Sequence, residues 1–466
     1  MFRLMIVYFM AVNYECKILN PVILVPGDGG SQIEAKLNKT TANPFCYRHT
    51  EGYYNLWVNQ EELFPHTITC FTDNMRLVYD KQKHVTRNSP GVETRIPGWG
   101  ETQTVEWLDP EHVADILSDG WKSTSYFSSI VNALVEWGYE RNVSVRAAPY
   151  DFRKAANEFD DFYKSFKALV EETYALNNNT KVVLVGHSMG NPTTLYFLNH
   201  QSQSWKDKFI HSFITLAGVW GGSVKPLILL ATGDNMGISW LWPSQVRHQQ
   251  RSMPSTAWLM PSDKFWGKDE ILVEQPGRNY TVNDYEQFFI DMNFTDGWYM
   301  RQDTANLVKS LTPPGVEVHC LHGYAVPTPA KLVYTGHMWP DIYPNVTMDG
   351  GDGTVNIRSL QGCLLWKGKQ QQKIYHHQIK GVGHIEILKN KDIIAYLEKI
   401  LTRGHTSPTP VSWWCLFCTV LFRLGYYVFL IAFYLLVFIL FAGILMLFLF
   451  WPMTWFNPIR IFRRFV

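Results

Sequence analysis

The 466-residue sequence has almost no net charge, few cysteines and no recognisable metal-binding pattern. Its 42 basic and 41 acidic residues leave a formal charge of +1, which argues against a nucleic acid or another polyanion as a partner. Seven cysteines are too few for a small disulfide-rich scaffold. Because HExxH sequences, matched CxxC pairs and acidic calcium loops are all missing, we expect neither a metal ion nor another cofactor.

Charged residues are also missing from a long apolar stretch near the C-terminus, residues 424–453. At about 1.5 Å per residue, a helix of this length exceeds a hydrocarbon core of about 30 Å, so we expect one tilted transmembrane helix. Residues 404–423 would form a stalk before it, and the basic segment 454–466 favours a cytoplasmic tail after it. The apolar residues 1–16 resemble a signal peptide, with a peripheral first strand as the alternative.

Six N-x-S/T sequons precede the apolar stretch, as in a glycoprotein whose body is lumenal or extracellular. Their asparagines are Asn38, Asn142, Asn178, Asn279, Asn293 and Asn345. Together with the expected anchor they predict a single-pass membrane protein of an endomembrane compartment or the cell surface.

Strand patterns alternate with helix patterns over residues 17–403, which predicts an α/β domain with a mainly parallel, helix-covered sheet. The expected strands are 21–25, 143–147, 181–185, 209–216, 320–324 and 374–379, and the expected helices are 125–138, a segment ending near 176, a segment ending near 200, and 391–401. Residues 46–110 are aromatic and loop-rich, and we expect an insert there. Residues 217–330 are too long for a connection and predict a cap over the sheet.

The sequence Gly186-His-Ser-Met-Gly190 joins the apolar run 181–185 to a helical pattern. A serine on such a tight strand-to-helix turn exposes its hydroxyl above the sheet, and glycines fit where side chains would collide. This placement predicts Ser188 as a nucleophile, whereas an ordinary β-α turn with a surface serine is the alternative.

A serine hydroxyl needs a base within hydrogen-bond reach, and a third group to orient that base. In α/β-hydrolases an acid and then a histidine follow the serine along the chain. Asp352, in a glycine-rich loop, and His384, after the last expected strand, provide this order. Asp349 is the rival acid, with Asp352 favoured by its spacing.

Two N–H groups are needed to stabilise the oxyanion of acyl transfer. Met189, which follows the nucleophile, supplies one of them. We assign the other to the backbone N–H of Asp28, in the turn after the first expected strand.

Two cysteine pairs each flank a loop-like segment. Cys46 and Cys70 form one pair, and Cys320 and Cys363 the other. Each pair could close a disulfide bond in an oxidising compartment.

Several longer segments match one known family. They include Val25–Asp28, Ala147–Asp151, His187–Asn191, Gly351–Asn356 and His384–Glu386. On these segments the chain resembles the lecithin–cholesterol acyltransferase family over roughly residues 20 to 401, most closely its lysosomal phospholipase A (group XV) branch.

The resemblance implies an α/β-hydrolase fold with an inserted cap and a small membrane-binding subdomain around Cys46–Cys70. It implies a triad of Ser188, Asp352 and His384, and oxyanion donors at Asp28 and Met189. The spacing of both cysteine pairs is like that of the family's bridged pairs.

By the same resemblance, an acyl chain would pass from a glycerophospholipid of a bilayer to the serine, and then to water, a sterol or a ceramide-like alcohol. Two alternatives are a neutral-lipid ester hydrolase on the same fold and a catalytically silent lipid-binding membrane protein.

Overall fold

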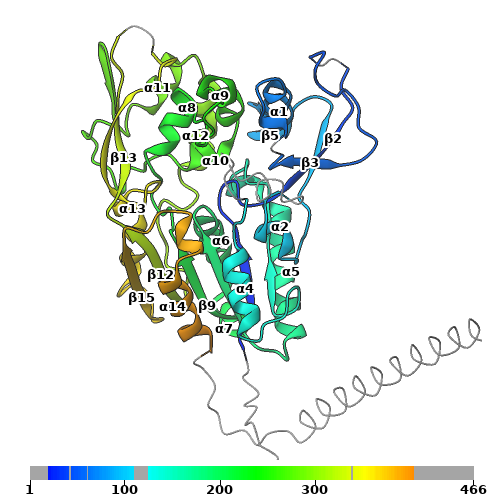
Figure 1. The fold of residues 1–466 in the computed structure, drawn as a ribbon. Helices are drawn as coiled ribbons and strands as arrows, with labels where there is room; N and C mark the ends of the chain where they lie inside the picture. The colour runs from blue at the N-terminus through cyan, green and yellow to red at the C-terminus, as the bar shows by residue number, and fades with distance from the viewer. Residues whose placement is uncertain (1–18, 41–42, 60, 110–123, 337–338, 403–466) are drawn as a thin grey trace, which may run out of the picture. The chain divides into compact units, whose positions relative to one another are not determined.

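A six-stranded sheet in the order β15-β12-β9-β8-β1-β7 runs through the molecule (Figure 1). Its strands are β1 (Val22–Val25), β7 (Val145–Ala147), β8 (Val182–His187), β9 (Ile210–Leu216), β12 (Glu317–Tyr324) and β15 (Ile374–Lys380). All five pairings between neighbours are parallel. The structure, a computed structural model, describes residues 19–40, 43–59, 61–109, 124–336 and 339–402. The α/β prediction is therefore confirmed, as is each expected strand.

Helices cover both faces of this sheet. Successive strand residues point to opposite faces, and apolar residues on each face form a hydrophobic core that helices must cover. Ile23 and Val25 of β1 face one core, and Val22 and Leu24 face the other. The helices of the first core include α5 (Asp160–Leu176) and α6 (Gly190–Asn199), whereas α4 (Ser128–Glu136) and α14 (Lys391–Thr402) pack in the second. The other short helices that pack against the main sheet, on one face or the other, are η2 (Ala156–Glu158), α7 (Gln203–Phe209), α13 (Ile357–Leu360), η3 (Gln361–Trp366) and η4 (Glu386–Leu388).

A cap of helices and a second sheet stands beyond one end of the main sheet (upper left in Figure 1). Its helices are α8 (Lys225–Ala231), α9 (Pro243–Arg251), α10 (Pro254–Trp258), α11 (Tyr285–Asp291) and α12 (Thr295–Thr304). Its four strands, in the order β11-β10-β13-β14, are β10 (Val273–Gln275), β11 (Arg278–Tyr280), β13 (Val326–Val333) and β14 (Asn345–Gly351).

The cap differs from the expected range 217–330 in one respect. Strand β12 falls inside that range but belongs to the main sheet, because it pairs in parallel with β9. The chain then returns to the cap through β13, which pairs with β14 beyond residue 330. The cap is thus built from two stretches on either side of a core strand.

Most of the expected insert, 46–110, belongs to a small subdomain of short strands and helices (upper right in Figure 1). Its elements are β2 (Ile33–Leu37), β3 (Tyr54–Trp57), η1 (Glu61–Leu63), α1 (Ile68–Met75), β4 (Leu77–Asp80), β5 (Val85–Asn88) and β6 (Val92–Arg95). The short helix α2 (Gln103–Glu106) follows and packs against α4 beside the main sheet. Strand β2 pairs antiparallel with both β3 and β6, and β4 pairs with β5. The sequence pattern did not predict these strands individually, because they have only four or five residues, too few to show a clear period.

Within the described ranges, no helix has both the length and the apolar character that crossing a bilayer requires. The segments expected as a signal peptide (1–16), stalk (404–423), transmembrane helix (424–453) and basic tail (454–466) lie outside the described residues.

Candidate active site

Ser188 occupies a sharp turn between β8 and α6. Its φ is +52°, in the left-handed region that non-glycine residues seldom adopt, and its N–H donates to the carbonyl oxygen of Leu216 at 3.0 Å. A Cβ on Gly190 would lie 2.3 Å from the carbonyl oxygen of Val25, so only glycine fits there. This is the strained serine turn that the sequence pattern predicts.

His384 lies between Ser188 and Asp352, although the three residues are far apart along the chain. Its Nε2 is 2.8 Å from Ser188 Oγ, and its Nδ1 is 2.7 Å from Asp352 Oδ2. The backbone N–H of His384 also donates to the carbonyl oxygen of Asp352 at 2.8 Å. The imidazole is therefore oriented to accept the serine proton at Nε2 while donating from Nδ1 to the carboxylate.

Asp352 is only 1% exposed, yet it is held as a carboxylate. Burial opposes its ionisation, but the facing His384 ring and the N–H groups of Val355 and Thr354 lower its pKa below the usual value. These N–H groups donate to Oδ1 at 2.8 and 3.1 Å. The rival acid Asp349 is exposed, and its carboxylate accepts the N–H of Gly350.

The turn after β1 packs directly against the serine turn. A Cβ on Gly27 would lie 2.7 Å from Ser188 Cβ, which shows how closely the two backbones approach. Among the described residues, no hydrogen bond uses the N–H of Asp28 or of Met189. Both groups are thus free to donate to an atom bound beside Ser188.

Two side chains hold this turn in place. The Tyr150 hydroxyl donates to the carbonyl oxygen of Pro26 at 2.8 Å, and the Trp57 indole donates to that of Gly29 at 2.8 Å. Because Trp57 belongs to β3, the small subdomain contacts the turn directly.

The Asp28 side chain reaches solvent, but the protein atoms crowded around it still desolvate the carboxyl group. This desolvation raises its pKa to about 6, although Lys225 and the N–H of Gly29 act in the opposite direction. The charge beside the serine turn therefore changes between about pH 5 and pH 7.

A buried tyrosine and a second histidine were not predicted as parts of this site. The Tyr126 hydroxyl oxygen lies 2.9 Å from the Gly27 nitrogen and 2.5 Å from His187 Nδ1. His187 Nε2 lies 3.0 Å from the carbonyl oxygen of His384. An ionisable residue inside the serine turn was a signal for His187, whereas no local pattern marks Tyr126.

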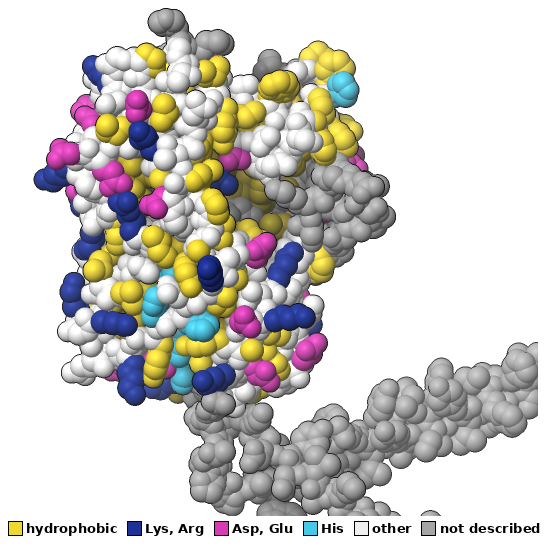
Figure 2. Space-filling view, turned by 60° about the vertical axis from the view of Figure 1, so that its left-hand side comes forward, with side chains coloured by type: hydrophobic (Ala, Val, Ile, Leu, Met, Phe, Trp, Pro, Cys, Tyr) yellow, Lys and Arg dark blue, Asp and Glu magenta, His cyan; other side chains and the backbone are white. Residues whose placement is uncertain are grey.

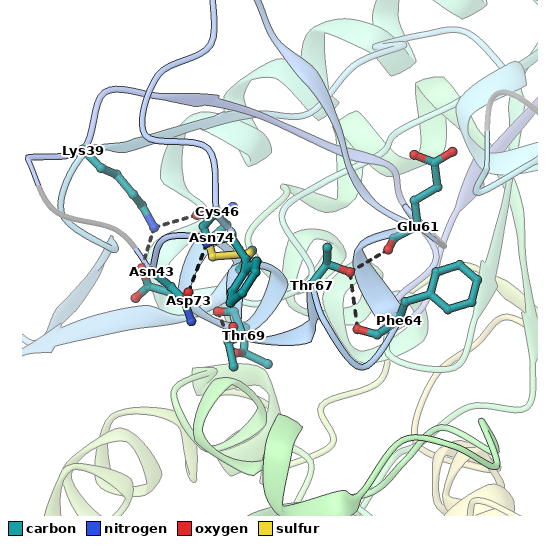
Figure 3. The surroundings of a disulfide bond; sticks show 12 residues. Lys39, Asn43, Cys46, Glu61, Phe64, Thr67, Thr69, Asp73 and Asn74 are labelled. Carbon is teal, nitrogen blue, oxygen red and sulfur yellow. Dashed lines mark hydrogen bonds and ion pairs between the residues drawn. A yellow bond between two sulfur atoms is a disulfide. The ribbon is translucent and has the colours of Figure 1, made fainter.

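Both cysteine pairs form the predicted disulfide bonds. The Cα–Cα distance is 5.4 Å for Cys46–Cys70 and 6.6 Å for Cys320–Cys363. Figure 3 shows the first bond in the small subdomain, where Lys39 Nζ donates to Asn74 Oδ1 at 2.6 Å and also contacts Asp73.

The residues beside Cys46 are among the most exposed large side chains of the described structure. Phe45 is 77% exposed and Tyr47 is 78% exposed. Figure 2 shows a group of hydrophobic side chains at the upper right of the molecular surface.

All six sequon asparagines have exposed side chains. They occur in the small subdomain, beside the main sheet and in the cap, so an attached glycan would meet no packed core at any of these positions.

The chain matches the family model described as Lecithin:cholesterol acyltransferase over residues 53–391. It is 45% identical over 382 residues to "Lysosomal phospholipase A and acyltransferase" of Mus musculus, covering 82% of this chain and 90% of that protein. It is 39% identical over 394 residues to "Phosphatidylcholine-sterol acyltransferase" of Homo sapiens, covering 84% of this chain and 87% of the relative. A solved chain from "The crystal structure of Tle4-Tli4 complex" aligns with a TM-score of 0.47 at 13% identity, covering 82% of this chain and 98% of that one.

Proposed function

Because this chain belongs to the lecithin:cholesterol acyltransferase family, we propose that it is a serine-dependent phospholipase A and O-acyltransferase. Its substrate would be a glycerophospholipid, and its acyl acceptor would be water or a lipid alcohol such as a sterol or a ceramide-like lipid. The named activities of the relatives support this substrate class. The arrangement of Ser188, His384 and Asp352 supports the acyl-transfer chemistry.

In the first half-reaction, Ser188 Oγ attacks the ester carbonyl carbon while His384 Nε2 takes the serine proton. The carbonyl oxygen becomes an oxyanion, which the N–H groups of Asp28 and Met189 would stabilise. Asp352 stabilises the imidazolium that forms beside it. The tetrahedral intermediate then expels the lysophospholipid alkoxide, which receives the proton from His384, and the acyl chain stays on Ser188.

In the second half-reaction, an acceptor hydroxyl attacks the acyl-serine carbonyl and passes its proton to His384. Collapse of this intermediate returns the proton to Ser188 and releases a fatty acid or a new ester. Hydrolysis and transfer thus share one intermediate, and the acceptor that reaches it decides the product.

The short contacts of His384 to both Ser188 and Asp352 carry this proposal, and Ser188→Ala tests it. The variant should lose phospholipid deacylation and transfer to an added alcohol, because Ser188 Oγ is the hydroxyl that contacts His384 Nε2 in the described part of the chain. Ser204→Ala, on the exposed surface of α7, is the matched control and should keep both activities. Unchanged deacylation in Ser188→Ala would refute the mechanism, and activity on neutral esters alone would favour the ester-hydrolase alternative.

We further propose that the small subdomain contacts the bilayer from which the substrate is taken. Phe45 and Tyr47 expose aromatic surface beside the Cys46–Cys70 bond, and aromatic rings are suited to the membrane interface. Phe45→Ser with Tyr47→Ser should weaken sedimentation with phosphatidylcholine vesicles while leaving hydrolysis of a water-soluble ester unchanged. Equal vesicle binding by variant and parent would remove this role.

The catalytic domain, 17–403, is proposed to be lumenal or extracellular, with residues 424–453 as a single transmembrane helix and 454–466 in the cytoplasm. The uncharged apolar stretch and the six exposed sequons support this topology. Treatment with an N-glycosidase should increase the gel mobility of the expressed protein, and alkaline carbonate should leave it in the membrane pellet. An unchanged mobility together with protease access from the cytosol would contradict it.

A further inference from the structure

The Tyr126 hydroxyl joins parts of the candidate site that come from three distant segments. It lies 2.9 Å from the nitrogen of Gly27 in the turn after β1, and 2.5 Å from Nδ1 of His187 in the serine turn. His187 Nε2 then lies 3.0 Å from the carbonyl oxygen of His384. The side chains of Tyr126, His187 and His384 are all buried, so water does not substitute freely for these bonds.

Only one arrangement of protons satisfies this chain of contacts. The carbonyl oxygen of His384 can only accept, so His187 carries its proton on Nε2. Burial, with the nearby His384 ring adding to it, lowers the pKa of His187 to about 3, so the ring is neutral and Nδ1 accepts. The Tyr126 O–H therefore donates to His187, and its oxygen accepts the Gly27 N–H.

The three residues that Tyr126 and His187 connect lie at or next to reacting groups. Gly27 precedes Asp28, whose N–H is a proposed oxyanion donor, and His187 precedes Ser188. The third contact holds the backbone of His384 itself. A reaction centre needs its groups within about 0.5 Å of their productive positions, so a bond network that fixes all three segments affects the rate directly.

We propose that Tyr126 is a positioning residue for acyl transfer: its hydroxyl, through His187, fixes the oxyanion turn, the nucleophile turn and the His384 loop relative to one another. This inference rests on the function proposed above. Tyr126 touches no reacting atom in the described contacts, so its effect is exerted through its neighbours.

Tyr126→Phe removes the one oxygen and keeps the ring, which packs against Gly30 and edge-on to Phe127. We expect kcat for phospholipid deacylation to fall about 10- to 100-fold, less than the loss of an entire oxyanion donor, with KM within about twofold. Tyr139→Phe is the matched control, because it also removes a buried tyrosine hydroxyl. That hydroxyl donates to the carbonyl oxygen of Asn20 before β1, at the end of the parallel sheet opposite to Ser188. The control should keep its kcat.

Two inhibitors separate positioning from a merely structural role. A long-chain trifluoromethyl ketone forms a tetrahedral adduct on the serine and needs the oxyanion donors, whereas a dialkyl ether phospholipid binds without reacting. Tyr126→Phe should weaken the ketone by about the same factor as kcat/KM and leave the ether lipid unchanged. An unchanged kcat, or equal weakening of both inhibitors, would overturn the inference.

Substitutions at His187 provide a second test should Tyr126→Phe fail to fold. In His187→Asn the amide oxygen can accept from Tyr126 near the former Nδ1 position, whereas His187→Leu removes both contacts. The leucine variant should lose at least tenfold more ketone affinity than the asparagine variant, and equal losses would refute the role of Tyr126. Unchanged deacylation by Ser188→Ala would instead refute the proposed function itself, so the two failures are distinguishable.

Discussion

Replacing Asp352 with asparagine should slow phospholipid deacylation about a thousandfold. The carboxylate oxygen lies 2.7 Å from His384 Nδ1, which places the centres of the two delocalised charges about 4 Å apart. At an effective dielectric constant of about 20, this pair contributes about 4 kcal/mol to the imidazolium-bearing transition state. Since each 1.36 kcal/mol is a factor of ten in rate, about three powers of ten should be lost.

Asparagine keeps the side-chain shape and an oxygen that can accept from Thr354 and Val355, so the loop should stay folded. Asp349→Asn is the matched control: it removes the same charge three residues away, from an exposed side chain that contacts Gly350. The assay is the initial rate of fatty acid release from phosphatidylcholine vesicles, with kcat and KM measured for both variants. The reasoning is refuted if Asp352→Asn keeps more than a tenth of kcat, or if both variants lose the same amount.

Three further predictions concern pH and stability. Burial raises the pKa of Glu62 to about 7. The free energy of unfolding should therefore be highest below about pH 4.5 and fall by up to about 3 kcal/mol as pH rises through 7. Glu62→Gln should remove this fall, which urea unfolding at several pH values measures. Ionised Asp28 would oppose a nearby oxyanion, so kcat should fall as pH rises through about 6, and Asp28→Asn should remove that fall. Replacing Cys46 and Cys70 by alanine should cost about 3 kcal/mol, because the bond closes a loop with a sequence separation of 24, and thermal unfolding measures it.

A specific result would contradict each of these three predictions. An unchanged pH profile of stability in Glu62→Gln would show that this carboxyl group is not desolvated. A retained fall of kcat in Asp28→Asn would assign the ionisation to another group. A melting temperature unchanged by the double alanine variant would show that the disulfide does not constrain the unfolded chain.

The core strands and the residues of the candidate site were predictable because local patterns encode them. Strand β8 is buried on both faces and reads as an apolar run, and Ser188 follows it at a glycine-flanked turn. Asp352 and His384 were identified by their order after the serine and by the glycines beside them. These patterns involve only a few neighbouring residues, so they can be recognised in the sequence before the fold is known.

Other features depend on contacts between distant segments and leave little trace in a local pattern. Strand β3 has four residues with mixed burial, so the small subdomain resembled a loop. Strand β14, which precedes Asp352, belongs to the cap sheet, although Asp352 itself contacts His384. Tyr126 meets its partner His187 across 61 residues, and only the folded chain shows that contact.

Labelling with a long-chain fluorophosphonate, followed by peptide mass spectrometry, tests most directly whether one serine carries the acyl chain. The reagent should attach once per chain, on the peptide that contains Ser188, and activity should fall in proportion to labelling. Complete inactivation with Ser188 unmodified, or full labelling of Ser188 with deacylation intact, would contradict the account.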